Sequence, residues 1–228
     1  LFLDSTRAAG LQAASIPYTG WGAQSLDADL DGWPDLVVAN GHVDDYRDEG
    51  GDYHMRPQVF QNSAGRFREL SPGEAGEWFG EKILGRGLAR LDWNLDGRPD
   101  FIVSSVNERT SVLQNTSTNV GHYVKVRLTA EQPARAAMGA QVPVSAGGRR
   151  WTKQLTAGDG YQASNERELL FGLGVAETID ELTVAWPSGG TSRLTDLEAD
   201  CQLRLGEGMP RGTLVRAGQL ASLSVTVS

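Results

Sequence analysis

The chain repeats one acidic pattern, first as Asp27-Ala28-Asp29-Leu30-Asp31-Gly32-Trp33-Pro34-Asp35 and again as Asp92-Trp93-Asn94-Leu95-Asp96-Gly97-Arg98-Pro99-Asp100. We name these stretches the first loop and the second loop. Aspartate or asparagine occupies positions one, three, five and nine, and the glycine at position six permits a sharp turn of the backbone. Side-chain oxygens at this spacing are typical of a site for a hard cation. The sequence therefore predicts two calcium sites.

Each predicted site has five ligands, four from side chains and one from the main-chain carbonyl at position seven. In the first loop these ligands come from Asp27, Asp29, Asp31, Trp33 and Asp35. In the second loop they come from Asp92, Asn94, Asp96, Arg98 and Asp100. Proline at position eight holds the chain next to the carbonyl ligand. Such a filled shell favours a structural role for the metal.

Two other interpretations compete with a repeated strand-connecting metal loop. An EF-hand needs a glutamate at position twelve and a helix on each side, but Val38 and Val103 stand there, and the flanks are β-prone. A solvated hairpin end is also possible for one such loop, because Asp, Asn, Gly and Pro are ordinary turn residues. The repetition of the whole pattern favours the metal site.

The repeat extends beyond the loops. Gly22 and Gly87 are 65 residues apart, which is also the offset between the two loops. Further along, Val59-Phe60-Gln61-Asn62 resembles Val112-Leu113-Gln114-Asn115 at an offset of 53 residues. The first copy therefore carries a polar insertion of about twelve residues within 41–54, which we expect at the surface.

These segments resemble FG-GAP/VCBS repeats, the calcium-loop blades of integrin-α-like β-propellers, over about half of the chain. The resemblance implies that each blade is a small antiparallel sheet whose loop joins two strands and is held rigid by a structural Ca²⁺. The pattern, with Asn40-Gly41-His42 after the strand, is most similar to bacterial relatives of cartilage acidic protein.

The second half of the chain resembles the ASPIC/UnbV domain that follows such propellers. The matching motifs are Gly121-His122-Tyr123-Val124-Lys125-Val126-Arg127-Leu128, Met138-Gly139-Ala140, Gly158-Asp159-Gly160-Tyr161, Phe171-Gly172-Leu173-Gly174 and Trp186-Pro187-Ser188-Gly189. One departure lies at Ala134 and Ala136, where the family often has polar residues beside the arginine. Any binding role of those polar residues is in doubt here.

Apolar and polar residues alternate in this half, as in Val124 to Leu128 and Leu182 to Trp186, which predicts strands. Gly147-Gly148 predicts a hairpin turn, and Leu223, Val225 and Val227 suggest a last strand. We expect an all-β protein in which a partial β-propeller of about two blades is followed by a small β-sandwich-like domain. The predicted boundaries are 1–117 for the blades and 118–228 for the second domain, with its core at about 119–207 and a C-terminal strand extension.

The net charge of -8 and the pI of about 4.9 argue against nucleic-acid binding, which requires a basic face. No apolar run is long enough to insert into a membrane. Cys201 is the only cysteine and is expected to be buried. Because the chain starts at Leu1 within a repeat, we expect further blades upstream. Calcium sites of this type favour a secreted, periplasmic or cell-surface protein.

The functional hypothesis is a calcium-binding interaction or adhesion module that binds a protein or glycan partner. The alternative is a calcium-dependent, lyase-like enzyme acting on polysaccharides, which would need an open calcium position and a nearby base. His42 and His54 flank the acidic insertion and could supply that base, although a solvated polar loop is the simpler interpretation. His122 is expected to be structural, and no catalytic residue is predicted.

Overall fold

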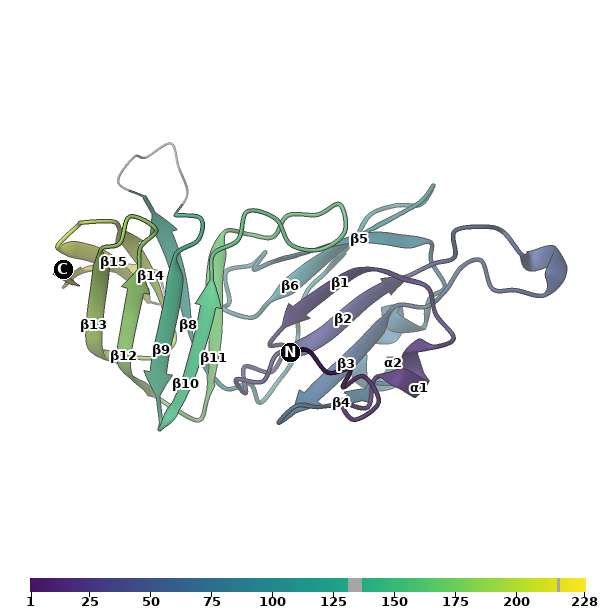
Figure 1. Ribbon diagram of the computed structural model, residues 1–228, viewed down its shortest axis with the longest axis horizontal. Helices are drawn as coiled ribbons and strands as arrows, with labels where there is room; N and C mark the ends of the chain where they lie inside the picture. The colour runs from purple at the N-terminus through teal and green to yellow at the C-terminus, as the bar shows by residue number, and fades with distance from the viewer. Residues whose placement is uncertain (131–136, 217) are drawn as a thin grey trace.

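A computed structural model describes residues 1–130, 137–216 and 218–228. The described chain is all-β, with four sheets and a few short helical turns, and none of the sheets closes into a barrel (Figure 1). The departure expected at Ala134 and Ala136 lies outside the described residues. No helix within the described ranges is long and apolar enough to cross a membrane.

The first half of the chain forms two antiparallel sheets. One sheet has the order β1-β2-β3-β4, with β1 (Gly20–Leu26), β2 (Asp35–Asn40), β3 (Gln58–Ser63) and β4 (Arg66–Glu69). The other has the order β5-β6-β7, with β5 (Gly85–Leu91), β6 (Asp100–Ser105) and β7 (Ser111–Leu113). Short turns precede or connect these strands as α1 (Gln12–Ser15), η1 (Arg47–Glu49), α2 (Pro72–Ala75) and η2 (Glu77–Gly80).

The backbone repeats with the same period as the sequence. Strands β5 and β6 begin 65 residues after β1 and β2, and both first strands carry a register shift at matching positions. The first loop joins β1 to β2, and the second loop joins β5 to β6. Leu30 and Leu95 have positive φ angles of 58° and 60°, and Gly32 and Gly97 have φ of 86° and 83°. The prediction that these loops connect strands is therefore confirmed.

The two sheets of the first half share a small apolar core. Strands β1 and β5 lie side by side, and a Cβ atom at Gly22 would lie only 2.7 Å from the Leu88 nitrogen. The core residues are Leu26, Val37, Ala39, Val59, Phe79, Ile83, Leu88, Phe101 and Val103. Residues 41–54 form the polar insertion, which Figure 1 shows projecting, with η1, from the end of the molecule away from the second half.

The second half consists of two five-stranded sheets packed on one core. The first sheet has the order β10-β9-β12-β13-β17, with β9 (Gln141–Ala146), β10 (Arg149–Gln154), β12 (Thr178–Ala185), β13 (Thr191–Glu198) and β17 (Thr226–Val227). The second has the order β11-β8-β14-β15-β16, with β8 (His122–Thr129), β11 (Glu168–Gly174), β14 (Cys201–Gly206), β15 (Arg211–Arg216) and β16 (Gln219–Ser224). Strands β8 and β14 pair in parallel.

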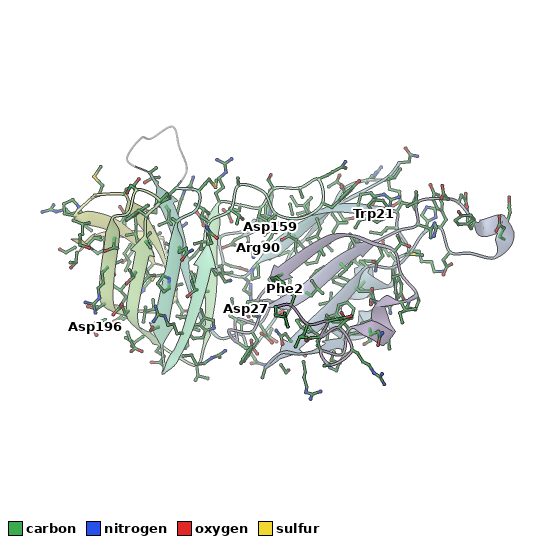
Figure 2. All side chains as sticks on the ribbon, viewed as in Figure 1. Phe2, Trp21, Asp27, Arg90, Asp159 and Asp196 are labelled. Atoms are coloured by element: carbon green, nitrogen blue, oxygen red, sulfur yellow. The ribbon has the colours of Figure 1, made fainter. Side chains whose placement is uncertain are left out.

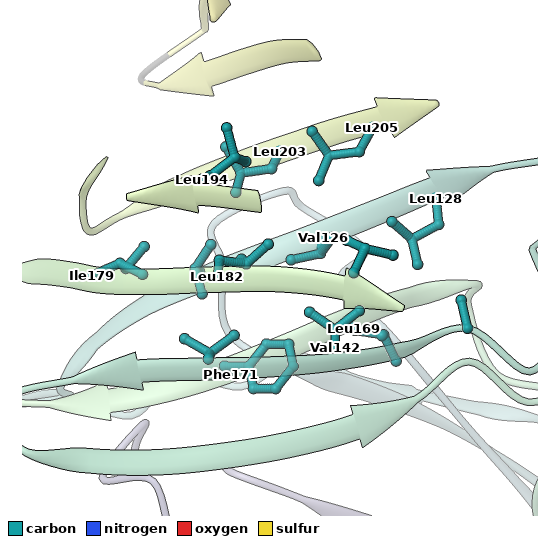
Figure 3. Packing of buried hydrophobic residues seen from close by; sticks show 14 of the residues in the cluster. Val126, Leu128, Val142, Leu169, Phe171, Ile179, Leu182, Leu194, Leu203 and Leu205 are labelled. Atoms are coloured by element: carbon teal, nitrogen blue, oxygen red, sulfur yellow. The ribbon is translucent and has the colours of Figure 1, made fainter. Parts of the chain in front are cut away.

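Alternation of apolar residues builds the core of this sandwich. Phe171 and Val126 come from one sheet, Leu182 and Val142 from the other, and all four are fully buried (Figure 3). The predicted hairpin at Gly147-Gly148 is confirmed by the β9–β10 register. Fully burying one such side chain stabilises the fold by about 1.5–3 kcal/mol, so this cluster is the main source of stability in the second half.

Two details of the second half can be compared with the sequence predictions. Cys201 is buried, with 1 % of its surface exposed, and burial raises the pKa of its thiol. The single last strand expected through Leu223, Val225 and Val227 is wrong. The chain divides there into β16 and β17, because the N–H of Val225 bonds to the carbonyl of Pro210 and turns the chain from one sheet to the other.

Candidate metal centre

Three carboxylates of the first loop converge. Asp27, Asp29 and Asp31 each offer one oxygen, and these atoms all lie within 4.8 Å of one another. Asp27 follows the last residue of β1 and is 5 % exposed, whereas the other two are half-buried. Figure 2 shows Asp27 near the junction of the two halves. The structure thus brings together three of the five ligands predicted for this loop.

Asp27 has one oxygen bonded and one left over. Its Oδ2 accepts a 3.0 Å hydrogen bond from the Gly32 N–H, whereas its buried Oδ1 has no hydrogen-bond partner among the described residues. Burial raises the pKa of Asp27 to about 7 despite the opposing charge of Lys153, and the charges of Asp31 and Asp29 add to the rise. Buried polar atoms are normally paired, so Oδ1 is an exception and is free to act as a ligand atom.

Asp35, at position nine, lies outside this group of three carboxylates. Its Oδ2 accepts from the Ala28 N–H at 3.0 Å and its Oδ1 from the Asn62 N–H at 2.8 Å. Burial raises its pKa to about 6. Asp35 therefore ties the first loop to β3. At position seven, the N–H of Trp33 donates to Asp31 Oδ1 at 2.7 Å, which holds the turn closed.

The second loop has the same backbone, but cations of the protein occupy its carboxylates. The ammonium of Lys125 lies 3.1 Å from Asp92 Oδ2 and also contacts Glu168 at 2.9 Å and Glu166 at 3.3 Å. Side-chain exposure of Lys125 is 5 %. Burial disfavours its charge, but the three carboxylates outweigh burial and raise the pKa of Lys125.

The other predicted ligands of the second loop are also paired. Asp96 forms an ion pair with the Arg98 guanidinium and accepts a 2.8 Å hydrogen bond from Asn94 Nδ2. Asp100 accepts from the N–H groups of Trp93 at 2.8 Å and Asn115 at 2.6 Å, as Asp35 does in the first loop. The two loops thus have the same backbone conformation but differ in the pairing of their charges.

The two loops differ in how many of their aspartates form ion pairs. The first loop carries four aspartates, and among the described residues none of them has an ion pair within 4.0 Å. The second loop carries three, and two of them are paired with Arg98 and Lys125. A divalent cation would therefore neutralise unpaired charge in the first loop, whereas in the second it would compete with an arginine and a lysine.

The second half of the chain covers both loops. Trp151 lies over Gly32, where a Cβ atom would come within 2.8 Å of its indole nitrogen, and Tyr123 lies over Gly97, where a Cβ atom would come within 2.2 Å of its ring. The position-six glycines thus serve two needs, a left-handed turn and a close approach. The spacing in the sequence predicts only the turn, and the close approach depends on the tertiary structure.

Sequence reasoning missed the residues of the second half that contact the loops. Lys125, Arg149 and Trp151 were interpretable only as members of alternating strands. A basic residue at a strand position that alternation predicts to be polar is common, so no local signal distinguished Lys125. Its partner Asp92 lies 33 residues away.

The three histidines lie apart from the carboxylate group. His42 Nδ1 is 2.9 Å from the carbonyl of Asp44 within the polar insertion, and His54 lies 3.3 Å from Glu108. His122 Nδ1 is 2.7 Å from Asp200 Oδ2. Within the part of the chain that the structure describes, the first loop is the one cluster of three metal-ligating side chains.

A cavity of about 240 Å³ lies between the two halves. Arg90 of β5 and Lys153 of β10 line it together with Asp159, and Figure 2 shows Arg90 and Asp159 at the junction. Lys153 donates to the carbonyl of Leu170 at 2.5 Å. Burial and the nearby charge of Arg90 lower the pKa of Lys153 to about 8.

The fold and its loops define an all-β protein with an acidic loop in each of two repeated sheets. Comparison with known families shows which domain follows them: the family model described as ASPIC and UnbV matches residues 130–211. The second half therefore carries an ASPIC/UnbV domain, as its motifs predicted. No curated protein matches the chain.

Proposed function

We propose that this chain is a calcium-binding extracellular interaction module, in which two FG-GAP/VCBS-type blades of a β-propeller carry an ASPIC/UnbV domain. The observation that carries the proposal is Asp27 Oδ1, a buried carboxylate oxygen without a partner among the described residues. An ionised carboxylate in such a place is costly unless a cation neutralises it.

The donor set favours Ca²⁺ over other ions. The converging atoms of Asp27, Asp29 and Asp31 are carboxylate oxygens, with no histidine or cysteine in the group, which disfavours zinc and copper. Mg²⁺ usually keeps several waters and demands a near-ideal octahedron, whereas Ca²⁺ accepts an irregular cage with carbonyl ligands. A nine-residue loop with a 5 % exposed first ligand fits the second description.

The two sites would fill in order. Calcium enters the first loop without displacing a protein cation, but in the second loop it must separate Arg98 from Asp96 and compete with Lys125 for Asp92. The second of the two predicted sites is therefore proposed as the weaker one. The metal serves structure in both, because each loop joins the two first strands of its sheet.

The proposed partner is a protein or a glycan, bound outside the cytoplasm. Trp93 and Leu95 of the second loop are 67 % and 76 % exposed. Large exposed apolar side chains beside charged ones are common at recognition surfaces, and tryptophan stacks on sugar rings. Secreted, periplasmic and cell-surface locations all provide enough calcium for such sites.

A lyase-like enzyme is the second candidate, and the cavity at the junction favours it. Lys153, with its pKa lowered to about 8, could accept a proton, and Arg90 could bind the carboxylate of an acidic sugar. Incubation with polygalacturonate or alginate, followed by absorbance of the unsaturated product, tests this candidate. No product from the wild-type chain in calcium would rule it out for these two substrates.

Calorimetric calcium titration of the chelator-treated chain tests the main proposal. Asp29→Asn should weaken the tighter site at least about tenfold, since it removes one of three converging charges. Asp180→Asn, at an exposed aspartate of β12, is the matched control. A wild-type chain that binds no calcium at millimolar concentration would refute the proposal.

A further inference from the structure

The first loop has five successive carbonyls that accept hydrogen bonds from the second half of the chain and from residues 114–121, the linker between β7 and β8. The pairs are Ala28 O with Asn115 Nδ2 at 2.8 Å, Asp29 O with Gly121 N at 2.8 Å, Leu30 O with Gly174 N at 2.9 Å, Asp31 O with Arg149 Nη1 at 2.7 Å, and Gly32 O with Trp151 Nε1 at 2.9 Å. Each carbonyl from Ala28 to Gly32 thus has its own hydrogen-bond donor in the linker or the ASPIC/UnbV half.

The second half packs closely against the first loop at two glycines. A Cβ atom at Gly172 would lie 2.1 Å from Asp27 Oδ2, and one at Gly121 would lie 2.3 Å from the Leu30 carbonyl oxygen. Leu30 itself has a φ of 58°, which residues other than glycine adopt rarely. A side chain at Gly172 or Gly121 would therefore prevent this docked arrangement of the loop.

One side-chain stack crosses the same junction. The guanidinium of Arg149 lies 5.0 Å from the ring centre of Trp33 in the first loop and 4.8 Å from that of Trp151 in β10. Stacked cations of this kind contribute about 0.5–1 kcal/mol each at partly exposed sites. Arg149 thus joins the two halves through its hydrogen bonds and its contacts with both rings.

The carboxylates and the carbonyls of the first loop have different surroundings. Its carboxylates converge to within 4.8 Å and repel one another when no cation is between them. Its carbonyls meet the linker and the second half. Repulsion between the carboxylates therefore opposes the loop shape in which the carbonyls meet their donors.

We infer that the ion in the first loop is an interdomain clamp, so that calcium occupancy and docking of the ASPIC/UnbV half on the blades are thermodynamically coupled. This inference rests on the proposed calcium binding and adds what the ion controls. Coupling is reciprocal: if calcium favours docking, docking must favour calcium by the same factor. Residues of the second half that never touch the ion then contribute to its affinity.

The coupling is expected at the first loop and not at the second. Its junction is held by the buried pair of Lys125 and Asp92, which needs no metal. Chelation should therefore loosen the contacts around Arg149 and Trp151 and leave those around Lys125 in place. The expected motion is a partial opening at the first loop.

Adjacent arginines of β10 provide the test. Arg149 contacts the first loop, whereas Arg150 is exposed on the same strand. In the full-length chain, Arg149→Ala should weaken calcium binding at the tighter site about 5- to 50-fold, within the usual range of coupling. Arg150→Ala should leave it within twofold. Trp151→Phe removes the N–H to Gly32 and part of the ring beside Arg149 but keeps the guanidinium, and should weaken binding less.

Hydrogen exchange supplies a second readout that does not need a variant. In chelator, the amides of Gly121 and Gly174 should exchange at least about tenfold faster than in calcium, because they donate to carbonyls of the first loop. The amides of β14 in the sandwich should be unchanged.

The outcomes separate the two claims. A wild-type chain that binds no calcium refutes the proposed function, and the clamp with it. Calcium binding that Arg149→Ala and Trp151→Phe leave within twofold, with no change in exchange at Gly121 and Gly174, refutes the clamp alone. Weakened binding in both variants, with normal binding in Arg150→Ala, supports the clamp.

Discussion

Replacing Asp27 with asparagine should stabilise the chain in chelator and yet leave it less stable than the wild type in calcium. The pKa of Asp27 is raised from 3.8 to about 7, chiefly by burial. An acid with a raised pKa prefers the protonated form in the fold, so the stability of the metal-free wild type falls as pH rises from about 4 to about 7.

The size of the effect follows from the same shift. A rise of about 3 pKa units at about 1.4 kcal/mol each means that ionised Asp27 destabilises the metal-free fold by about 4 kcal/mol at pH 8. Asparagine removes this cost but places an unpaired amide where Oδ1 has no partner, which costs about 1–3 kcal/mol. The net gain in chelator is about 1–3 kcal/mol, or roughly 2–12 °C in Tm.

Calcium reverses the order. At about 1,000 times its Kd, a ligand stabilises the folded state by about 4 kcal/mol. The wild type gains this amount, whereas the asparagine variant has lost a charged ligand and gains little. The wild type should then melt above the variant.

Differential scanning calorimetry at pH 8 in chelator and in 10 mM calcium, about 1,000 times a Kd of 10 µM within the range of calcium sites, measures both differences. Asp180→Asn on the exposed side of β12 is the control and should follow the wild type in both buffers. The reasoning is refuted by an Asp27→Asn variant that melts below the wild type in chelator and shifts equally in calcium. That result would mean that Oδ1 needs no cation.

Three further predictions concern charges around the loops. Arg98→Ala frees Asp96 and should tighten the weaker calcium site about fivefold, corresponding to about 1 kcal/mol. A two-site titration in which the variant and the wild type have the same affinity at the weaker site would contradict this. Lys125→Met strands buried carboxylates and should cost about 3–5 kcal/mol in chelator, and a loss no larger than that of the exposed Arg127→Met would be the contrary result. Between about pH 8 and 10.5 the unfolded state holds a proton that folded Lys153 has lost, so wild-type stability should rise with pH relative to Lys153→Met; parallel denaturation curves would disprove this.

Local patterns of the sequence predicted most of the elements. The alternation around Val124 and Leu182 marks β8 and β12, and the Gly147-Gly148 pair marks the β9–β10 turn. These succeed because side-chain alternation and turn chemistry depend on near neighbours. The failure at Val225 is equally instructive, since the bond to Pro210 that divides the strand is made by a residue far away in the sequence.

The candidate site was predicted only in part. The spacing in the first loop located Asp27, Asp29 and Asp31, which do converge, but treated the second loop as nearly equivalent. Arg98 was counted there for its carbonyl, whereas its guanidinium pairs with Asp96. Position seven of a loop gives no indication of where its side chain will lie.

By itself, the sequence determined that the chain has two matching acidic loops between β-strands and an ASPIC/UnbV domain after them, because those features are written in spacing and alternation. Only the tertiary structure decided which loop keeps its charge. Lys125 reaches Asp92 from the other half of the chain, whereas Arg149 of that half bonds to carbonyls of the first loop and leaves its carboxylates without an ion pair among the described residues. Burial and ion pairing depend on distances across space, and residue spacing along the chain does not specify them.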